Sequence, residues 1–232
     1  MPTLRILSLF ALALALAACD STDAIDPADL EIETAVEVAA DPGQRDPTTG
    51  RVDDTNRFTL YSLRDNRVVL SYADDDRSDS LTTAWDIGFR GSDVILNGGT
   101  SGPGDARGLL VPEAFESVRT AAGLALVADG EGSCPDVQTP GGPVPGTPRV
   151  VCGGGGNGWY TYVPFPGGQG GYLLPTPGRT LVVRTADGAG TAKIKFQNYY
   201  AGQPAAEDIG FTSEGRYYTF EFVLNPEGED FE

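Results

Sequence analysis

The 232-residue chain contains no histidine, and its single methionine is Met1. Without histidine, a Ser-His-Asp triad, a Cys-His pair and the common histidine-rich metal sites are excluded. Acid–base chemistry would fall to pairs of carboxylates, and in a chain with 33 acids the proximity of two of them indicates nothing by itself. We therefore expect that the protein is not an enzyme. A carboxylate-based carbohydrate hydrolase is the one enzymatic alternative.

Positive charge is also scarce, with 16 Lys and Arg residues and a formal net charge of −17. Nucleic-acid affinity comes largely from Lys and Arg, so we predict no nucleic-acid partner. The glycine-rich loop 98–104 lacks the Gly-Lys-Ser/Thr of a P-loop and has no helical or α/β surroundings, so it is interpreted as a turn region that follows a strand. The acidic runs 53–54 and 74–76 lack the spacing and central glycine of an EF-hand, which favours solvated loop charges over calcium ligands.

The N-terminus has the form of an export signal. Arg5 precedes a largely apolar run over residues 6–18, which is too short to span a bilayer and is typical of a signal-peptide core. The run ends Leu-Ala-Ala-Cys, as in a bacterial lipobox, although an ordinary secretory signal with an incidental cysteine is an alternative. We predict that residues 1–18 are a lipoprotein signal peptide and that Cys19 is lipidated, which would anchor an exported chain at the outer membrane or cell surface.

Cys134 and Cys152 are then the remaining cysteines, an even number in an oxidising compartment. They enclose CPDVQTPGGPVPGTPRVVC, a proline-rich loop in which little regular structure is expected. Two cysteines without histidine do not complete a zinc site. The sequence therefore predicts a structural disulfide between them and no metal centre.

Residues 19–56 are rich in acids and contain no aromatic side chain. Such a composition buries too little apolar surface to offset its ordering entropy, so we predict a flexible acidic tether. The stretch EIETAVEVAA within it could instead add an edge strand. Residues 57–232 are predicted to form one domain.

Alternation of apolar and polar residues predicts strand after strand in that domain. RFTLYSLR and RVVLSY suggest a hairpin, and TLVVRTA, TAKIKFQNYY and RYYTFEFVL alternate later. In LTTAWDIGFR the alternation places Trp85, Ile87 and Phe89 on one face with Leu81 and Thr83, and predicts that Asp86 faces solvent. The run TAKIKFQNYY sets Ala192, Ile194 and Phe196 against Lys193, Lys195 and Gln197.

Only PEAFESVRTAAG, with Pro112 at its start, predicts a short helix. Glycine and proline punctuate aromatic strands along the rest of the domain. The predicted fold class is all-β: a single antiparallel β-rich domain with long Gly/Pro loops, preceded by the flexible tether.

Tyrosines occur as close pairs at or near strand ends: Tyr160 with Tyr162, Tyr199 with Tyr200, and Tyr217 with Tyr218. Packing in the core and at its rim is one explanation for them, since aromatics are common in β domains. A flat ligand held between rings is the other. Periodicity does not choose between the two.

The segment TTAWDIGFRGSDVILNGGTSGPGDA resembles the signature of HmuY-family lipoproteins, in which a Trp-Asp-Ile-x-Phe strand and a second strand precede Asn-Gly-Gly-Thr-Ser-Gly. GWYTYVPF, TLVVRTADGAGTAKIKFQNYY and RYYTFEFVLNPEG follow in the order that the family predicts, so the resemblance covers roughly residues 57–226. It implies an all-β haem-binding architecture and a lipoprotein that captures haem for uptake. The implied partner is a TonB-dependent outer-membrane receptor.

In characterised members of that family, histidine or methionine side chains hold the haem iron axially. No such ligand can be transferred to any position of this chain, since it has no histidine and Met1 lies in the predicted signal peptide. If haem binds, either a tyrosinate coordinates the iron or contact is made through the porphyrin face alone. Tyr160, Tyr162, Tyr199 and Tyr200 are the candidate cofactor-binding residues. The alternative function is a surface scaffold or partner-binding lipoprotein that keeps the fold without haem binding.

Overall fold

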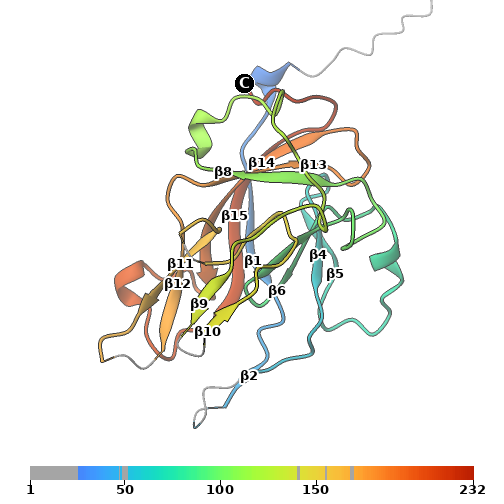
Figure 1. Ribbon diagram of the computed structural model, residues 1–232. Helices are drawn as coiled ribbons and strands as arrows, with labels where there is room; N and C mark the ends of the chain where they lie inside the picture. The colour runs from blue at the N-terminus through green and yellow to red at the C-terminus, as the bar shows by residue number, and fades with distance from the viewer. Residues whose placement is uncertain (1–25, 47, 49–51, 140–141, 155, 168–169) are drawn as a thin grey trace, which may run out of the picture.

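The computed structural model describes residues 26–232 except 47, 49–51, 140–141, 155 and 168–169. The predicted signal peptide and lipidation site at Cys19 lie outside these residues. Among the residues described, no helix has both the length and the apolar character needed to cross a membrane. The chain is built from antiparallel strands and short 3-10 turns, which confirms the all-β fold class (Figure 1).

Two sheets form a sandwich. The larger has the strand order β1-β15-β14-β13-β8, and the smaller has the order β5-β4-β6-β7. The strands of the larger sheet are β1 (Glu33–Ala39), β8 (Arg107–Val111), β13 (Thr180–Arg184), β14 (Thr191–Tyr200) and β15 (Gly215–Asn225). Those of the smaller sheet are β4 (Thr59–Ser62), β5 (Arg67–Leu70), β6 (Ile87–Arg90) and β7 (Asp93–Leu96).

Three two-stranded ladders project from this sandwich or border it (Figure 1). They are β2 (Gln44–Arg45) with β3 (Val52–Asp53), β9 (Val137–Thr139) with β10 (Gly142–Val144), and β11 (Tyr160–Pro164) with β12 (Gly171–Pro175). Four 3-10 turns complete the described elements: η1 (Pro27–Asp29), η2 (Ser78–Leu81), η3 (Phe115–Ser117) and η4 (Ala206–Asp208). The third ladder bears directly on the candidate site described below.

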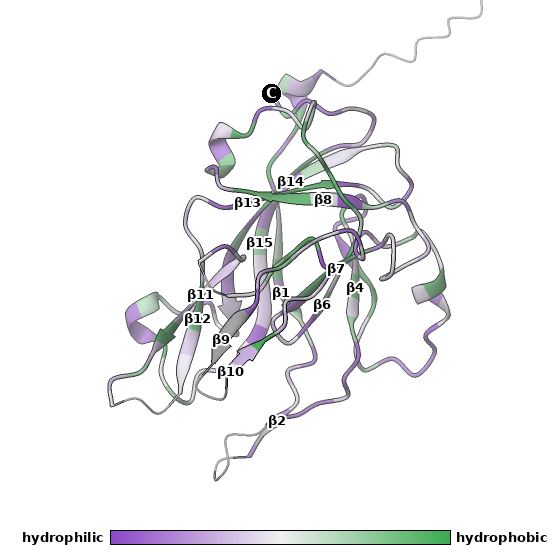
Figure 2. Ribbon diagram, in the orientation of Figure 1, coloured by the Kyte–Doolittle hydropathy of each residue, from purple (hydrophilic) through white to green (hydrophobic). Residues whose placement is uncertain are grey.

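The main core lies between the two sheets, where side chains from both inner faces meet. Phe89 of β6 packs against Tyr218 and Phe220 of β15, with ring centroids 4.5 Å and 5.5 Å apart. Three of the four residues that the alternation in RYYTFEFVL places on one face, Tyr218, Phe220 and Phe222, are fully buried, and Thr219 between them is buried as well. Hydrophobic residues are accordingly concentrated on the strands, for example along β8 (Figure 2). The sandwich therefore rests on an aromatic interior drawn from both sheets.

The middle of the predicted tether belongs to the larger sheet. Residues 33–39 form β1, which pairs antiparallel with β15 and buries Ala35 and Val38. The tether prediction is wrong for this stretch, and the edge-strand alternative is the one found. The glutamates of this stretch made its composition typical of a flexible tether. An edge strand, however, needs only one buried face and can carry charges on its other side. Cys19, at the start of the predicted tether, is outside the described residues.

The predicted helix over residues 112–123 is also wrong, because only Phe115–Ser117 makes a 3-10 turn. Tertiary contacts use the segment's polar groups instead. The carbonyl oxygens of Phe115 and Val118 accept hydrogen bonds from the Lys193 ammonium at 3.2 Å and 2.9 Å, and the Ala121 amide donates to the Glu229 carbonyl. The segment covers the outer face of the larger sheet, where it forms a second core cluster.

Lys193 corrects a further expectation, since the alternation of its strand placed it on the polar face. Its residue exposure is only 3%, and burial lowers the pKa of its ammonium. The rings of Phe115 and Phe231 lie 4.7 Å and 5.6 Å from the nitrogen. Both faces of β14 are therefore covered here, one by the smaller sheet and one by residues 115–121 and the C-terminal tail.

The strand predicted over LTTAWDIGFR is shorter than expected. It begins at Ile87, and Leu81 ends a 3-10 turn with 78% of its surface exposed. The buried side chain of Asn97 explains the irregular path, because its amide donates to the carbonyls of Thr82 and Trp85. The hairpin predicted from RFTLYSLR and RVVLSY is confirmed as β4 and β5.

Asp86 is buried, with 5% exposure, instead of facing solvent. Its two carboxylate oxygens accept hydrogen bonds from the amides of Leu63 and Ala186, at 2.9 Å and 2.8 Å. Burial raises the pKa of this carboxyl group, while the two amides act to lower it. Because Leu63 follows β4 and Ala186 follows β13, Asp86 ties the two sheets together. It is a structural crosslink between backbone segments.

The glycine-rich loop after β7 is a turn region, as predicted. Gly98 bridges to Asp105, and the Gly104 amide donates to the Asn97 side chain at 3.0 Å. Gly99 has a φ of +59°, and a Cβ atom there would lie 1.9 Å from the carbonyl oxygen of Asp129. Close packing of the backbone therefore requires glycine at this position. No phosphate-binding role is needed to explain it.

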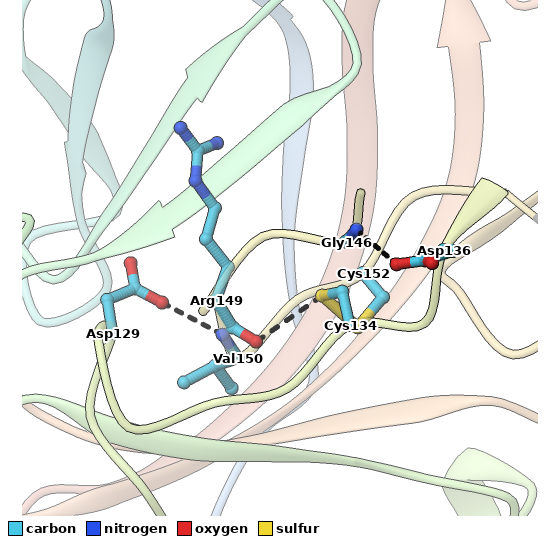
Figure 3. The surroundings of a disulfide bond; sticks show 7 residues. All are labelled: Asp129, Cys134, Asp136, Gly146, Arg149, Val150 and Cys152. Atoms are coloured by element: carbon cyan, nitrogen blue, oxygen red, sulfur yellow. Dashed lines mark hydrogen bonds between the residues drawn. A yellow bond between two sulfur atoms is a disulfide. The ribbon is translucent and has the colours of Figure 1, made fainter. Parts of the chain in front are cut away.

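The disulfide between Cys134 and Cys152 is confirmed. Figure 3 shows its surroundings, in which buried Asp129 accepts a hydrogen bond from the Val150 amide at 2.9 Å. The other oxygen of Asp129 accepts from the Leu96 amide at the end of β7, so this carboxylate fastens the disulfide loop to the smaller sheet. The enclosed loop contains the β9–β10 hairpin, more regular structure than the sequence predicts.

Candidate functional site

The third ladder projects from the sandwich as an arm, defined here as residues 160–175, of which 168 and 169 are not described. Trp159 fixes its root. The indole is buried, its Nε1 donates to the Ser92 carbonyl at 3.0 Å, and its ring contacts Phe196 and Tyr218. The Trp159 amide donates to the Cys152 carbonyl, which places the disulfide next to the root of the arm.

Beyond its root the arm packs on the sandwich through partly buried side chains, since Tyr172, Leu173 and Leu174 lie against the main core. All residues of β11 and β12 are half-buried or exposed. The amide of Leu173 donates to the Tyr200 hydroxyl at 2.9 Å, and the ring of Phe165 lies 6.2 Å from that of Phe211. A two-stranded hairpin with so few buried side chains is marginally stable by itself. These contacts set how the arm sits over the end of β14.

A groove of about 1040 Å³ opens between the arm, the end of β14, the connection from β14 to β15, and the start of the β2–β3 ladder. We call it the aromatic groove. Its aromatic lining comprises Phe165 and Tyr172 from the arm, Tyr199 and Tyr200 from β14, Phe211 from the connection, and Tyr217 from β15. Its size is that of small-molecule sites in proteins, which are mostly apolar with a few polar groups.

The groove's rings differ in exposure. Tyr199 and Tyr200 are buried to 6% exposure and form its base, edge to face with centroids 5.4 Å apart. Phe211 is 59% exposed, although a large apolar ring is normally covered. Phe165 packs on Tyr172 at a centroid distance of 5.3 Å. A buried aromatic base beside the exposed ring of Phe211 and the half-buried rings of Phe165 and Tyr172 presents faces on which a flat ligand can stack.

Arg216, the one Lys or Arg on the described lining of the groove, is committed to the protein. The Arg216 guanidinium donates to the Asp41 carbonyl and the Asp54 carboxylate, both at 2.7 Å. Arg216 lies in the left-handed backbone region with a φ of 72°, next to Gly215 at the start of β15. Within the described part of the chain, no three His, Cys, Asp or Glu side chains are grouped so as to hold a metal ion. The groove therefore provides ring faces more than free ligands.

The four tyrosines predicted as cofactor-binding are only partly brought together. Tyr199 and Tyr200 line the groove, whereas Tyr160 and Tyr162 are not among its described lining residues. The ring of Tyr160 packs against Trp159 at a centroid distance of 4.9 Å, and a Cβ at Gly153 would lie 3.0 Å from its hydroxyl. Tyr162 is 52% exposed on β11.

Burial also restricts the chemistry of the base. Desolvation raises the pKa of the Tyr199 phenol, so its tyrosinate form is disfavoured. The Tyr200 hydroxyl is already the acceptor for the Leu173 amide. A tyrosinate ligand to iron at these positions would require both environments to change, whereas stacking against the rings would not.

Sequence reasoning missed Phe165, Tyr172 and Phe211, because each is a single aromatic in or beside a glycine-rich loop. The signal for two of them was present: the segments FPGGQGG and IGFTSEG each contain one phenylalanine in an otherwise small and polar stretch. Periodicity does not report on such residues, since it describes strands and not connections.

Comparisons with known proteins add little to this geometry. No family model matches the chain, and no curated protein matches it. Among solved structures, it is similar to one titled "Crystal structure of Tannerella forsythia Apo HmuY analog (TFO)". The identity is 14%, the match covers 85% of this chain and 96% of that chain, and the TM-score is 0.41. A likeness this distant supports no argument about the site.

Proposed function

We propose that this chain is an exported, lipid-anchored binding protein whose aromatic groove holds haem or a similarly flat, apolar ligand. The observation that carries the proposal is the groove itself: a buried tyrosine base with the exposed ring of Phe211 beside it. The resemblance of residues 82–106 to the HmuY signature supports haem as the ligand to test first.

The contact that we propose is through the ring faces and not through an axial side chain. The chain has no histidine, and the buried phenol of Tyr199 is poorly placed to ionise. Stacked aromatic contacts contribute about 0.5–1.5 kcal/mol each beyond the area that they bury, so several together can hold a porphyrin-sized ring. When bound, haem would bring its own iron chemistry. The residues of the groove would bind and orient it and exclude water from one face.

A haemin titration of the purified chain, followed at the Soret band, tests this proposal. We expect a saturable shift of the Soret band. The affinity for haemin should fall about tenfold in Phe211→Ala, because a stacking face is lost. Tyr199→Phe, which keeps the ring and removes the oxygen, should bind as the wild type does. Tyr162→Ala is the matched control, because it removes an aromatic ring of the arm that does not line the groove.

The absence of a saturable Soret shift would sink the haem proposal. A loss of the shift in Tyr199→Phe would replace face contact with coordination by a tyrosine oxygen. Equal weakening in Phe211→Ala and Tyr162→Ala would show that the effect comes from a displaced arm, which Phe211 contacts through Phe165, and not from a lost stacking face.

One observation favours the alternative function, a surface scaffold that binds a protein partner. β1 is one edge strand of the larger sheet and β5 is one edge strand of the smaller sheet, and another groove between them exposes Val36 and Val68. Exposed apolar side chains on sheet edges are the features used in strand-addition recognition. A chain that gives no Soret shift but retains this edge would leave the scaffold as the function to pursue.

A further inference from the structure

A second cleft, of about 680 Å³, shares Leu173, Tyr199 and Tyr200 with the aromatic groove but follows the connection between β12 and β13. We call it the Arg179 cleft. Its apolar lining includes Leu174, Pro175, Phe196, Pro204 and Ile209. Among these, Phe196 and Ile209 belong to the main core cluster, so the cleft reaches the core of the sandwich from its surface.

Arg179 is a half-buried cation on this lining. Its Nη2 donates to the Gly156 carbonyl at 3.0 Å, and among the described side chains no carboxylate lies within 4.0 Å of it. Arg77 is also without an ion pair there, but it donates to the carbonyls of Ser71 and Phe58 and lines no described cleft. In a chain with 33 acids, a guanidinium that lines an apolar cleft without a carboxylate is unusual.

A second cation lies at the same end of the β13–β14 ladder. Leu181 pairs with Ile194, so Arg179 and Lys195 both sit just beyond this pair. The Lys195 ammonium is 3.3 Å from Glu116 and 3.8 Å from Glu221. Glu116 is the one acid on the described lining, against two cations, whereas the whole chain has twice as many acids as bases. Because Glu116 and Glu221 offset the charge of Lys195, Arg179 is the cation of the described lining that has no carboxylate partner among the described side chains.

We propose that the Arg179 cleft binds an amphipathic carboxylate of the fatty-acid class. The planar guanidinium of Arg179 matches a carboxylate in its fork geometry. The acyl tail lies along Leu174, Phe196 and Ile209, where its burial is favourable. This site goes beyond the proposed haem function and does not depend on it, since the Arg179 side chain is not part of the aromatic groove.

Isothermal titration of the full chain with decanoate and with 1-decanol, which share a tail and differ in the charged end, tests the proposal. We expect decanoate to bind saturably and about tenfold more tightly than decanol. Arg179→Gln should lose about tenfold in decanoate affinity and leave decanol unchanged, because only the charged contact is removed. Arg67→Gln is the control, since it removes an exposed arginine on β5 that lines neither the cleft nor the groove.

Two further measurements keep the test decisive if Arg179→Gln folds poorly. Arg179→Lys keeps the charge without the fork and should bind decanoate with intermediate affinity. In the wild type, added salt should weaken decanoate binding and not decanol binding. Equal affinities for the acid and the alcohol, or an unchanged decanoate affinity in Arg179→Gln, would overturn the site.

The haem proposal can be tested independently of the Arg179 cleft. Phe211→Ala should weaken haemin and leave decanoate unchanged, because Phe211 lines only the groove. Arg179→Gln should weaken decanoate binding and leave haemin binding unchanged. If each variant weakens the binding of both haemin and decanoate, the two ligands share one cavity. The proposal of a second site is then wrong.

Discussion

The sandwich and the arm differ in how far their side chains are buried. In the sandwich, β15 buries Tyr218, Phe220 and Phe222 completely, and the carboxylate of Asp86 accepts backbone hydrogen bonds that link its two sheets. In the arm, each residue of the two strands is half-buried or exposed. The candidate groove lies where the arm meets the sandwich. Its base therefore belongs to the more stable region and its outer wall to the less stable one.

This difference bears on how such a site could work. Regions with few buried contacts open at lower free energy than the fold as a whole, and binding surfaces are commonly drawn from them. A rigid base keeps Tyr199 and Tyr200 in position, while a weakly held wall can adjust to a ligand. The comparison predicts that perturbations of the sandwich will be global and that those of the arm will be local.

The largest effect is expected at Asp86. Asp86→Ala leaves the buried amides of Leu63 and Ala186 without their acceptor, which we expect to lower the free energy of unfolding by about 3–5 kcal/mol. Asp86→Asn, whose side chain keeps a single oxygen acceptor, should lose less. Denaturant unfolding with the disulfide intact measures both.

Asp75→Ala is the matched control for this prediction, because the Asp75 side chain is fully exposed. It should change stability by no more than about 0.5 kcal/mol. A loss below about 1 kcal/mol in Asp86→Ala would contradict the crosslink between the sheets.

Sequence patterns predicted the sandwich better than they predicted its connections. The alternation in RYYTFEFVL identified the buried face of β15, because a strand in a sandwich repeats every two residues. The same rule misplaced Asp86 and Lys193, since alternation cannot show that amides or carbonyls from distant segments will meet a charged side chain in the interior. Composition misplaced β1 for a related reason: its buried face consists of only two small or branched residues.

The candidate site was half predictable. Tyr199 and Tyr200 end a strongly patterned strand, so their proximity to each other could be expected. The wall that makes them a groove comes from Phe165, Tyr172 and Phe211, and their meeting depends on how an arm and a loop pack in three dimensions. The Arg179 cleft could not be predicted from the sequence, because only the folded structure shows that no carboxylate of the described side chains lies near Arg179.

The disulfide lies next to the root of the arm, and removing it should have the second largest effect. The double variant Cys134→Ser with Cys152→Ser releases a crosslink with a sequence separation of 18, for which loop entropy predicts a loss of about 3 kcal/mol. The Cys152 carbonyl accepts a hydrogen bond from the Trp159 amide, so we also expect faster amide hydrogen exchange at the root of the arm. Unfolding of oxidised and reduced wild type provides the control. Identical midpoints for the two forms would rule out a stabilising role.

The smallest effect is expected at the hydrogen bond that holds the arm. Tyr200→Phe removes the acceptor of the Leu173 amide and should cost about 1 kcal/mol, expressed locally. Hydrogen exchange should quicken at Leu173 and be unchanged at Leu181, which lies in the buried centre of the larger sheet. Tyr162→Phe, on the exposed face of the arm, should change neither. If Tyr200→Phe instead lowers global stability by the same amount and leaves exchange at Leu173 unchanged, the arm and the sandwich unfold as one unit. The groove would then have two rigid walls, and a ligand would have to match its shape without adjustment of the arm.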